Sequence, residues 1–80
     1  MAMTGTDLVK LESLGLTPRE AEALAWVAQG KSNNSIGAIL GISPRTVQKH
    51  LERTFTKLGV ESRTAAAAQA LAVVWEKVQG

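Results

Sequence analysis

Hydrophobic residues recur along this chain at the spacing of amphipathic helices, and helix-breaking residues divide the pattern into four segments. Two segments open with a capping residue followed by proline, Thr17-Pro18 and Ser43-Pro44, a pattern typical of a helix start. A glycine follows each of the first three segments, and glycine readily adopts the left-handed conformation that closes a helix. We therefore predict an all-α fold. The expected helices span about residues 18–29, 33–40, 44–58 and 63–78.

The predicted helix 44–58 divides most clearly into two faces. With about 100° between successive residues, its apolar stripe contains Val47, Leu51, Thr54 and Leu58. Its far side carries Arg45, Lys49, Glu52 and Thr56, flanked by Gln48 and Arg53. One face is therefore expected to pack in the core, and the other to be polar and mostly cationic.

The remaining helices have apolar stripes of their own. The expected buried positions are Ala21, Leu24, Val27 and Ala28 in the first, Ile36, Ile39 and Leu40 in the second, and Ala67, Leu71, Val74 and Val78 in the last. A second stripe on the last helix contains Ala68, Ala72 and Trp75. Between the second helix and the cap of the third lie only Gly41 and Ile42, and such a tight glycine-containing link is the turn of a helix-turn-helix.

The first fifteen residues carry a weaker signal. We predict a flexible arm or linker over residues 1–15, within which residues 7–14 are long enough for a short helix. A helix of that length is marginal in isolation. The helix-turn-helix domain itself is expected to span residues 16–80.

Composition excludes several classes of function. Eighty residues suffice for one domain but bury too little surface to enclose a deep catalytic cavity. The chain has no cysteine and one histidine, so neither a disulfide framework nor a zinc site is expected. It shows no nucleophile–base pair and no apolar run near the roughly 20 residues that cross a bilayer. We therefore expect a soluble protein that is not an enzyme, holds no metal or cofactor and does not enter a membrane.

The net charge is concentrated in one segment. Between Arg45 and Lys57 there are four basic residues and one acidic residue, a balance of +3, whereas the rest of the chain carries −1. A polyanion is expected to dock on this segment.

The side chains of helix 44–58 suit DNA in particular. A helix fits the major groove of B-DNA, where Gln48 can pair with adenine, Lys49 can bond guanine and Glu52 can accept from cytosine. Other residues suit phosphates, which position a protein without reading sequence. These expected phosphate contacts are Arg45, His50, Arg53 and Lys57, with Ser32, Asn33, Asn34, Ser43 and Thr46 as neutral donors near helix starts. Polar helix faces are also common as plain solvated surface, but the tight turn before this helix favours DNA.

Four blocks of the sequence resemble the LuxR-type helix-turn-helix domain: LTPREAEAL from Leu16, the glycine at Gly30, LGISPRTVQKHL from Leu40, and KLGVESRTAAAAQA from Lys57. The resemblance implies a bacterial transcription regulator that binds double-stranded DNA as a homodimer, with helix 44–58 in the major groove. It implies that Ala68, Ala72 and Trp75 of the last helix form the dimer contact. It further implies a cytoplasmic, nucleoid-associated protein, and an upstream receiver or sensor domain in a full-length regulator.

The chain departs from the family pattern at two places. Ser35-Ile36-Gly37 stands where the family commonly has Glu-Ile-Ala. Because glycine inside a helix costs about 1 kcal/mol relative to alanine, we expect helix 33–40 to be softer than usual. Glu52 is acidic where many members are basic, so transfer of a known binding site to this chain is unsafe.

Two alternatives stay open at this stage. The promoter-reading region of bacterial sigma factors shares the L-T-P-R-E opening and a similar helix-turn-helix, and it would make RNA polymerase a partner. That region normally ends soon after the recognition helix, whereas here a capped helix of about 16 residues follows Gly59. The other alternative is a helical dimerisation module that does not bind DNA.

Overall fold

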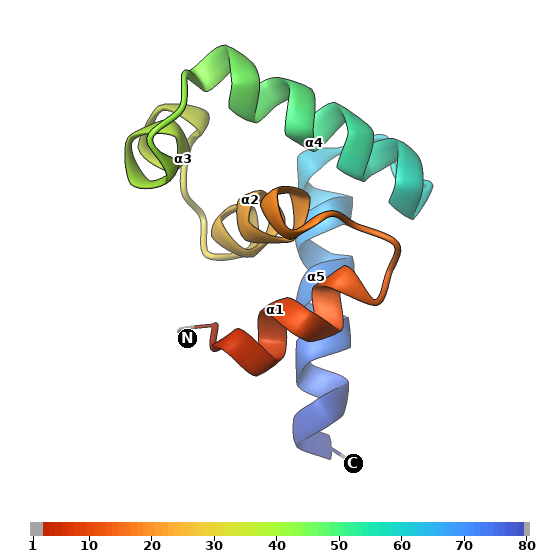
Figure 1. The fold of residues 1–80 in the computed structure, drawn as a ribbon. Coiled ribbons are helices and arrows are strands. Elements are labelled where there is room, and N and C mark those ends of the chain that lie inside the picture. Colours follow the sequence, from red (N-terminus) through yellow and green to blue (C-terminus); the bar gives the residue numbers. More distant parts are fainter. Residues whose placement is uncertain (1–2, 80) are drawn as a thin grey trace.

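The computed structural model describes the backbone of residues 3–79 and the side chains of residues 3–75. This part of the chain forms five helices and no strand, so the predicted all-α fold is confirmed (Figure 1). The helices are α1 (Gly5–Glu12), α2 (Pro18–Ala28), α3 (Asn33–Leu40), α4 (Pro44–Leu58) and α5 (Arg63–Gln79). None of these helices is long and apolar enough to cross a membrane.

Helix α1 replaces most of the predicted flexible arm. The hydroxyl of Thr4 accepts a bond from the Asp7 N–H, and the Asp7 carboxylate accepts one from the Thr4 N–H, which closes a capping box. Leu11 is fully buried against α2 and α5. A short helix was the structured option expected within this segment, and tertiary packing stabilises a helix that would be marginal alone. The helix also lies two residues earlier than the expected 7–14.

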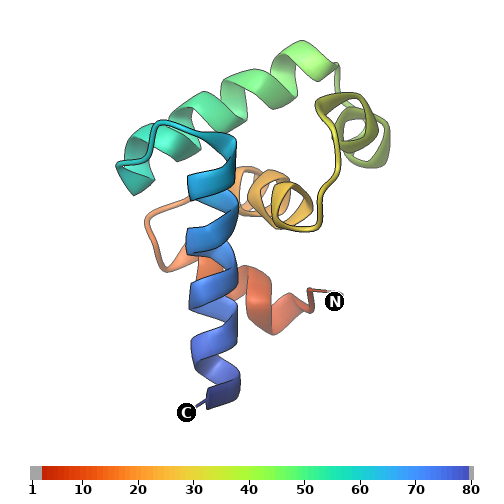
Figure 2. The ribbon, with the colours of Figure 1, turned by 180° about the vertical axis from the view of Figure 1, so that it is seen from behind.

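Helix α2 lies at the centre of the domain, in contact with α1, α4 and α5 (Figures 1 and 2). Thr17 and Glu20 form the predicted start, each side chain accepting a hydrogen bond from the backbone N–H of the other. The helix ends at Ala28, one residue before the predicted end, with Gln29 as its C-cap.

The turn between α3 and α4 is tight, as predicted. Gly41 ends α3 in the left-handed conformation, with φ of 72°, and the Ser43 hydroxyl caps α4 by accepting from the Thr46 N–H. Gly37 lies directly against this turn: a Cβ there would be 2.6 Å from the carbonyl oxygen of Ile42. The glycine thus permits a close approach of α3 to the turn, which helix propensity alone did not reveal.

Two hydrophobic clusters form the core. One joins α1, α2 and α5 through Leu11, Leu16, Ala21, Leu24, Ala25, Ala66, Ala70 and Val74. The other joins α2, α3 and α4 through Ala23, Val27, Ile36, Val47 and Leu51. Thr54 is also fully buried, and its hydroxyl donates to the carbonyl of His50 at 2.7 Å. The predicted apolar face of α4 is therefore confirmed, with Leu58 half-buried.

Two of the predicted buried positions are wrong. Ile39 is 47% exposed, because α3 buries Ile36 and Gly37 and turns Ile39 outward. Leu71 is 37% exposed, because α5 buries Ala66 and Ala70, each one residue before the expected Ala67 and Leu71, together with Val74, which was predicted. The run of alanines from 65 to 68 carries no difference in size or polarity that could set this rotation. Val78 lies outside the described side chains.

The arrangement leaves one side of α4 uncovered. Helices α1 and the C-terminal half of α5 lie at the end of the domain away from α4, and α2 lies between (Figures 1 and 2). The core-facing side of α4 packs on α2 and α3, so its opposite side faces solvent.

Candidate nucleic-acid interface

The outward face of α4 is built by the burial of its opposite face. Because Val47, Leu51 and Thr54 are fixed in the core, the residues half a turn away must point to solvent. The side chains that the structure leaves exposed there are Arg45, Gln48, Lys49, Glu52, Arg53 and Thr56. We call these six residues the α4 outer face. It contains all three predicted base-reading residues.

Gln48 and Glu52 are not independent on this face. The Gln48 Nε2 donates to the Glu52 Oε1 at 3.2 Å, one helical turn apart. Together with Arg45 and Lys49 they line a shallow open hollow on the surface. The carboxylate of Glu52 therefore accepts from Gln48 and lies near the two cations, whose positive charge it partly offsets.

The predicted neutral phosphate donors other than Asn34 have hydrogen-bond partners within the fold. Ser43 caps α4, and its Oγ lies 2.9 Å from the Thr46 Oγ1. Ser32 caps α3 by accepting from the Ser35 N–H, and its hydroxyl donates to the Ser35 Oγ at 3.2 Å. Both serine hydroxyls therefore serve the helix starts. Asn34 is exposed, and His50 and Thr46 are half-buried at the edge of the outer face.

Asn33 is held by a residue that the sequence did not single out. The Nη1 of Arg63 donates to the Asn33 Oδ1 at 2.7 Å, and its Nη2 donates to the carbonyl of Lys31 at 2.6 Å. These contacts join the first residue of α5 to the start of α3. Arg63 is 30 residues from Asn33 in the sequence, so no local pattern could have indicated the pair.

Lys57 is placed differently from the other cations of α4. Its Nζ lies 2.7 Å from the Oε1 of Glu20, whose side chain is only 3% exposed. Burial by itself would raise the pKa of the Glu20 carboxyl. The hydrogen bonds from Lys57 and from the Thr17 N–H, with the charge of Lys57, outweigh burial, and the pKa of Glu20 is lowered. Lys57 was predicted to contact phosphate, and the structure gives it a partner inside the fold.

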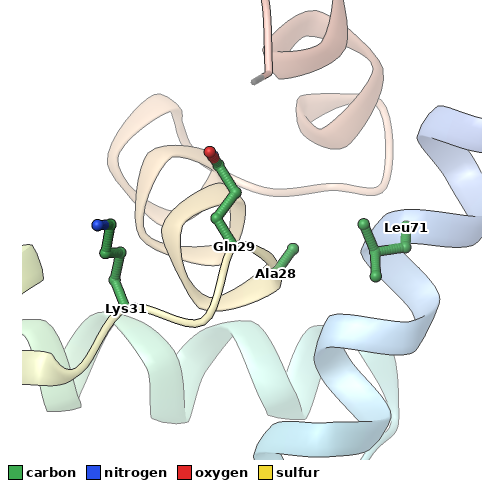
Figure 3. A pocket seen from close by; sticks show the side chains of 4 residues that line it. All are labelled: Ala28, Gln29, Lys31 and Leu71. Carbon is green, nitrogen blue, oxygen red and sulfur yellow. The ribbon is translucent and has the colours of Figure 1, made fainter. Parts of the chain in front are cut away.

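A separate apolar patch lies on α5. Ala68, Leu71, Ala72 and Trp75 line one surface there, and Trp75 is 55% exposed. We call these four residues the α5 patch. It contains the three predicted dimer residues and adds Leu71. Figure 3 shows the Leu71 side chain facing Ala28 across a hollow that Gln29 and Lys31 also line.

The chain also shows clear similarity to known regulators. The family described as bacterial regulatory proteins, luxR family, matches residues 14–70. The transcriptional activator protein BjaR1 of Bradyrhizobium diazoefficiens is 46% identical over 89% of this chain and 32% of that protein. The quorum sensing-dependent regulator RpaR of Rhodopseudomonas palustris is 54% identical over 70% of the chain and 23% of that protein.

A third relative, the transcriptional activator protein LuxR of Aliivibrio fischeri, is 46% identical over 70% of the chain and 22% of that protein. No solved structure matches the chain. The chain spans less than a third of the length of these curated relatives. Since the family match covers most of the chain, including the tight turn and all of α4, this protein belongs to the luxR family of bacterial regulatory proteins.

Proposed function

We propose that this chain binds double-stranded DNA sequence-specifically to regulate transcription in a bacterium, with α4 in the major groove. The observation that carries the proposal is the uncovered α4 outer face, which presents cationic and amide side chains on a helix whose other side is fixed in the core. The relatives named as transcriptional activators support the same role.

The roles within the outer face follow from side-chain chemistry. Lys49 is suited to the acceptor groups of guanine, Gln48 to adenine and Glu52 to the amino group of cytosine. Gln48 and Glu52 bond each other in the absence of DNA, so base reading requires them to exchange that bond for bonds to base edges. The bond between Gln48 and Glu52 is exposed and therefore weak, so losing it costs little. The exchange therefore favours the DNA sequence whose bases offer partners to both side chains.

Phosphate contacts would then come from the edges of the face. Arg45 and Arg53 are exposed cations on α4, and neither has a salt-bridge partner within the side chains that the structure describes. Phosphate oxygens are the natural partners for such side chains at a DNA surface. Asn33 and Asn34 at the start of α3, with His50 and Thr46 beside the outer face, would add weaker contacts.

A homodimer is the second part of the proposal. A single module of this size buries roughly 600–1,000 Å² on DNA, so useful affinity requires two copies on a two-fold site. The α5 patch supplies an exposed apolar surface, including Trp75, on a helix distinct from α4. Contact between two such patches would leave both outer faces uncovered.

We further infer that the domain works within a longer regulator. Its curated relatives are three or more times longer than the part that this chain matches, and RpaR is named as quorum sensing-dependent. A signal-binding or receiver domain preceding the DNA-binding domain fits these lengths. In the cell such a regulator would be cytoplasmic and nucleoid-associated when bound to DNA.

Packing of α5 favours a regulator over a sigma-factor-like promoter reader with RNA polymerase as its partner. Ala66, Ala70 and Val74 of α5 complete the core with α1 and α2, so this helix is an integral part of the domain.

Selection of bound sites from a random pool of DNA duplexes, with the 80-residue chain as bait, tests the proposal directly. We expect an enriched half-site in two-fold symmetric pairs, with affinity that falls as salt rises. A pool that shows no enrichment, or binding that ignores ionic strength, would overturn the proposal. Binding to core RNA polymerase with promoter recognition would favour the sigma-like alternative, and dimers without DNA affinity would favour the dimerisation module.

A further inference from the structure

We propose that Arg63 is a positioning residue for DNA binding, which acts by fixing Asn33 at the start of α3 as a phosphate donor. The inference rests on the proposed function, because it assigns a role within the same DNA-binding surface. Arg63 belongs to α5, outside the helix-turn-helix itself.

The place of Arg63 in its helix is unfavourable without these contacts. Ser62 caps α5 by accepting from the Ala65 N–H at 3.0 Å, so Arg63 is the first helical residue. The N-terminus of a helix carries a partial positive charge, which repels a cation. The guanidinium is directed instead to the loop between α2 and α3, where it meets two oxygen atoms.

Arg63 donates hydrogen bonds from both terminal nitrogens of its guanidinium group. Nη1 reaches the Asn33 side chain at 2.7 Å, and Nη2 reaches the Lys31 carbonyl at 2.6 Å. Both are short bonds from a charged donor, the stronger class of hydrogen bond in proteins. Gly30 precedes this loop with φ of 82°, and the Lys31 side chain extends away from α5 (Figure 3). Arg63 thus fixes the α2–α3 loop through the Lys31 carbonyl and fixes the start of α3 through the Asn33 side chain.

The contact fixes which way the Asn33 amide faces. Its oxygen accepts from Arg63, so the Nδ2 group is the end that is left to donate. Within the described side chains this nitrogen has no recorded partner, and no buried side-chain nitrogen lacks one, so Nδ2 is open to solvent. It lies at the N-terminus of α3, where the helix dipole favours an anion. A DNA phosphate oxygen is the acceptor that fits both features.

A double-mutant cycle on DNA affinity tests this coupling. The probe is a duplex recovered in the selection above, and the readout is the dissociation constant from fluorescence anisotropy. We expect Arg63→Ala and Asn33→Ala each to weaken binding by roughly tenfold, and the double variant to be hardly weaker than either. The matched control combines Arg63→Ala with Arg53→Ala. Because Arg53 does not contact Asn33, the two fold-losses of DNA affinity should multiply in that double variant.

Asn33→Asp separates positioning from folding. An aspartate keeps an acceptor for Arg63 and gains an ion pair, so the thermal midpoint should be maintained. It loses the Nδ2 donor and adds a negative charge, so DNA affinity should fall by tenfold or more. This variant decides the question even if Arg63→Ala fails to fold. Arg63→Lys keeps the charge but not the fork, and it should restore only part of the affinity.

The outcomes are distinct. If the losses from Arg63→Ala and Asn33→Ala multiply, or if Asn33→Asp binds DNA as tightly as the parent chain, the inference is overturned while DNA binding stands. If the parent chain enriches no duplex, the proposed function fails instead.

Discussion

The ammonium of Lys57 lies 2.7 Å from a carboxylate oxygen of Glu20 and thereby ties the last turn of α4 to the first turn of α2. The same oxygen, Oε1, accepts the Thr17 N–H at 2.9 Å, so one buried atom serves both the helix cap and the link between helices. Because α4 carries the outer face, this pair helps to set the orientation in which that face is presented.

Replacing Lys57 tests whether this cation serves the fold or the phosphates. Lys57→Met removes the partner of a buried carboxylate, and the free energy of unfolding should fall by about 1–3 kcal/mol. The slope of log affinity against log salt should stay unchanged, because the Lys57 charge is already neutralised. Urea unfolding and a salt titration of DNA binding provide the measurements.

Arg53→Ala is the matched comparison, with the opposite expectation. Arg53 is exposed, so stability should change by less than about 0.5 kcal/mol, while the salt slope should fall by about one. A reduced salt slope for Lys57→Met would place Lys57 on DNA and contradict this division of roles.

The Glu20 carboxyl should make stability depend on acid pH. Its pKa is lowered in the folded state, so the unfolded chain binds its proton at higher pH than the folded chain does. Its stabilising contribution is therefore present above the ordinary value of about 4.5 and is lost as pH falls through the lower folded pKa. Denaturant unfolding across acid pH should show this loss for the parent chain and a flatter profile for Glu20→Gln. Equal profiles would contradict the assignment.

Substitution of Gly37 should destabilise the domain although alanine is the better helix former. Propensity alone predicts a gain of about 1 kcal/mol for Gly37→Ala. The new Cβ would be 2.6 Å from the Ile42 carbonyl oxygen and 3.3 Å from the Pro44 nitrogen, both backbone atoms. We expect the clash to prevail, with a net loss of about 1–3 kcal/mol in chemical unfolding. Gly5→Ala is the control, because no atom lies within 4 Å of a Cβ placed there. A Gly37→Ala variant that is more stable than the parent chain would contradict the prediction and show that the turn can shift to make room.

Trp75 should matter for association more than for folding. It is 55% exposed on the α5 patch, so Trp75→Ala should leave the thermal midpoint of the monomer nearly unchanged. If two patches meet, the same change should weaken dimerisation by tenfold or more, because large aromatic side chains dominate such contacts. Sedimentation velocity with and without DNA measures both states. Val9→Ala, another exposed apolar position, serves as control; a dimer indifferent to Trp75 would refute the patch as interface.

Lys49 and Gln48 should control which bases are preferred. Lys49→Ala should cost about 1–3 kcal/mol at one base position and relax the preference there. Gln48→Ala should have a similar effect at another position, and it also frees Glu52 from its bond at 3.2 Å. Selection with each variant, compared with Thr56→Ala on the same face, shows whether a position loses its preference. Unchanged motifs for both variants would contradict base reading by these residues.

Much of the helix-turn-helix could be predicted from the sequence. The bounds of α3 and α4 agree with the prediction, and the capping roles of Thr17, Glu20 and Ser43 are confirmed. Those signals act over three or four residues, within one turn of helix, so they do not depend on the rest of the fold. The polar face of α4 was predictable for the same reason. Its role in base reading stays a prediction.

Interactions between distant residues were not predictable. The pairing of Lys57 with Glu20 spans 37 residues and that of Arg63 with Asn33 spans 30. Each depends on where two helices come to lie, which no local spacing encodes. The sequence showed a glycine at position 37 but not the turn packed against it.

By itself, then, the amino-acid order determined where α2 begins, where α3 and α4 begin and end, and which side of α4 is polar. Helix caps, helix-breaking residues and hydrophobic periodicity act over a few residues that differ clearly in polarity and size. Only tertiary packing decided that α1 is part of the core and that α5 buries Ala66, Ala70 and Val74 while Leu71 faces outward. Short helices and runs of alanine have little preference of their own, so their conformation and rotation follow from the surfaces against which they pack.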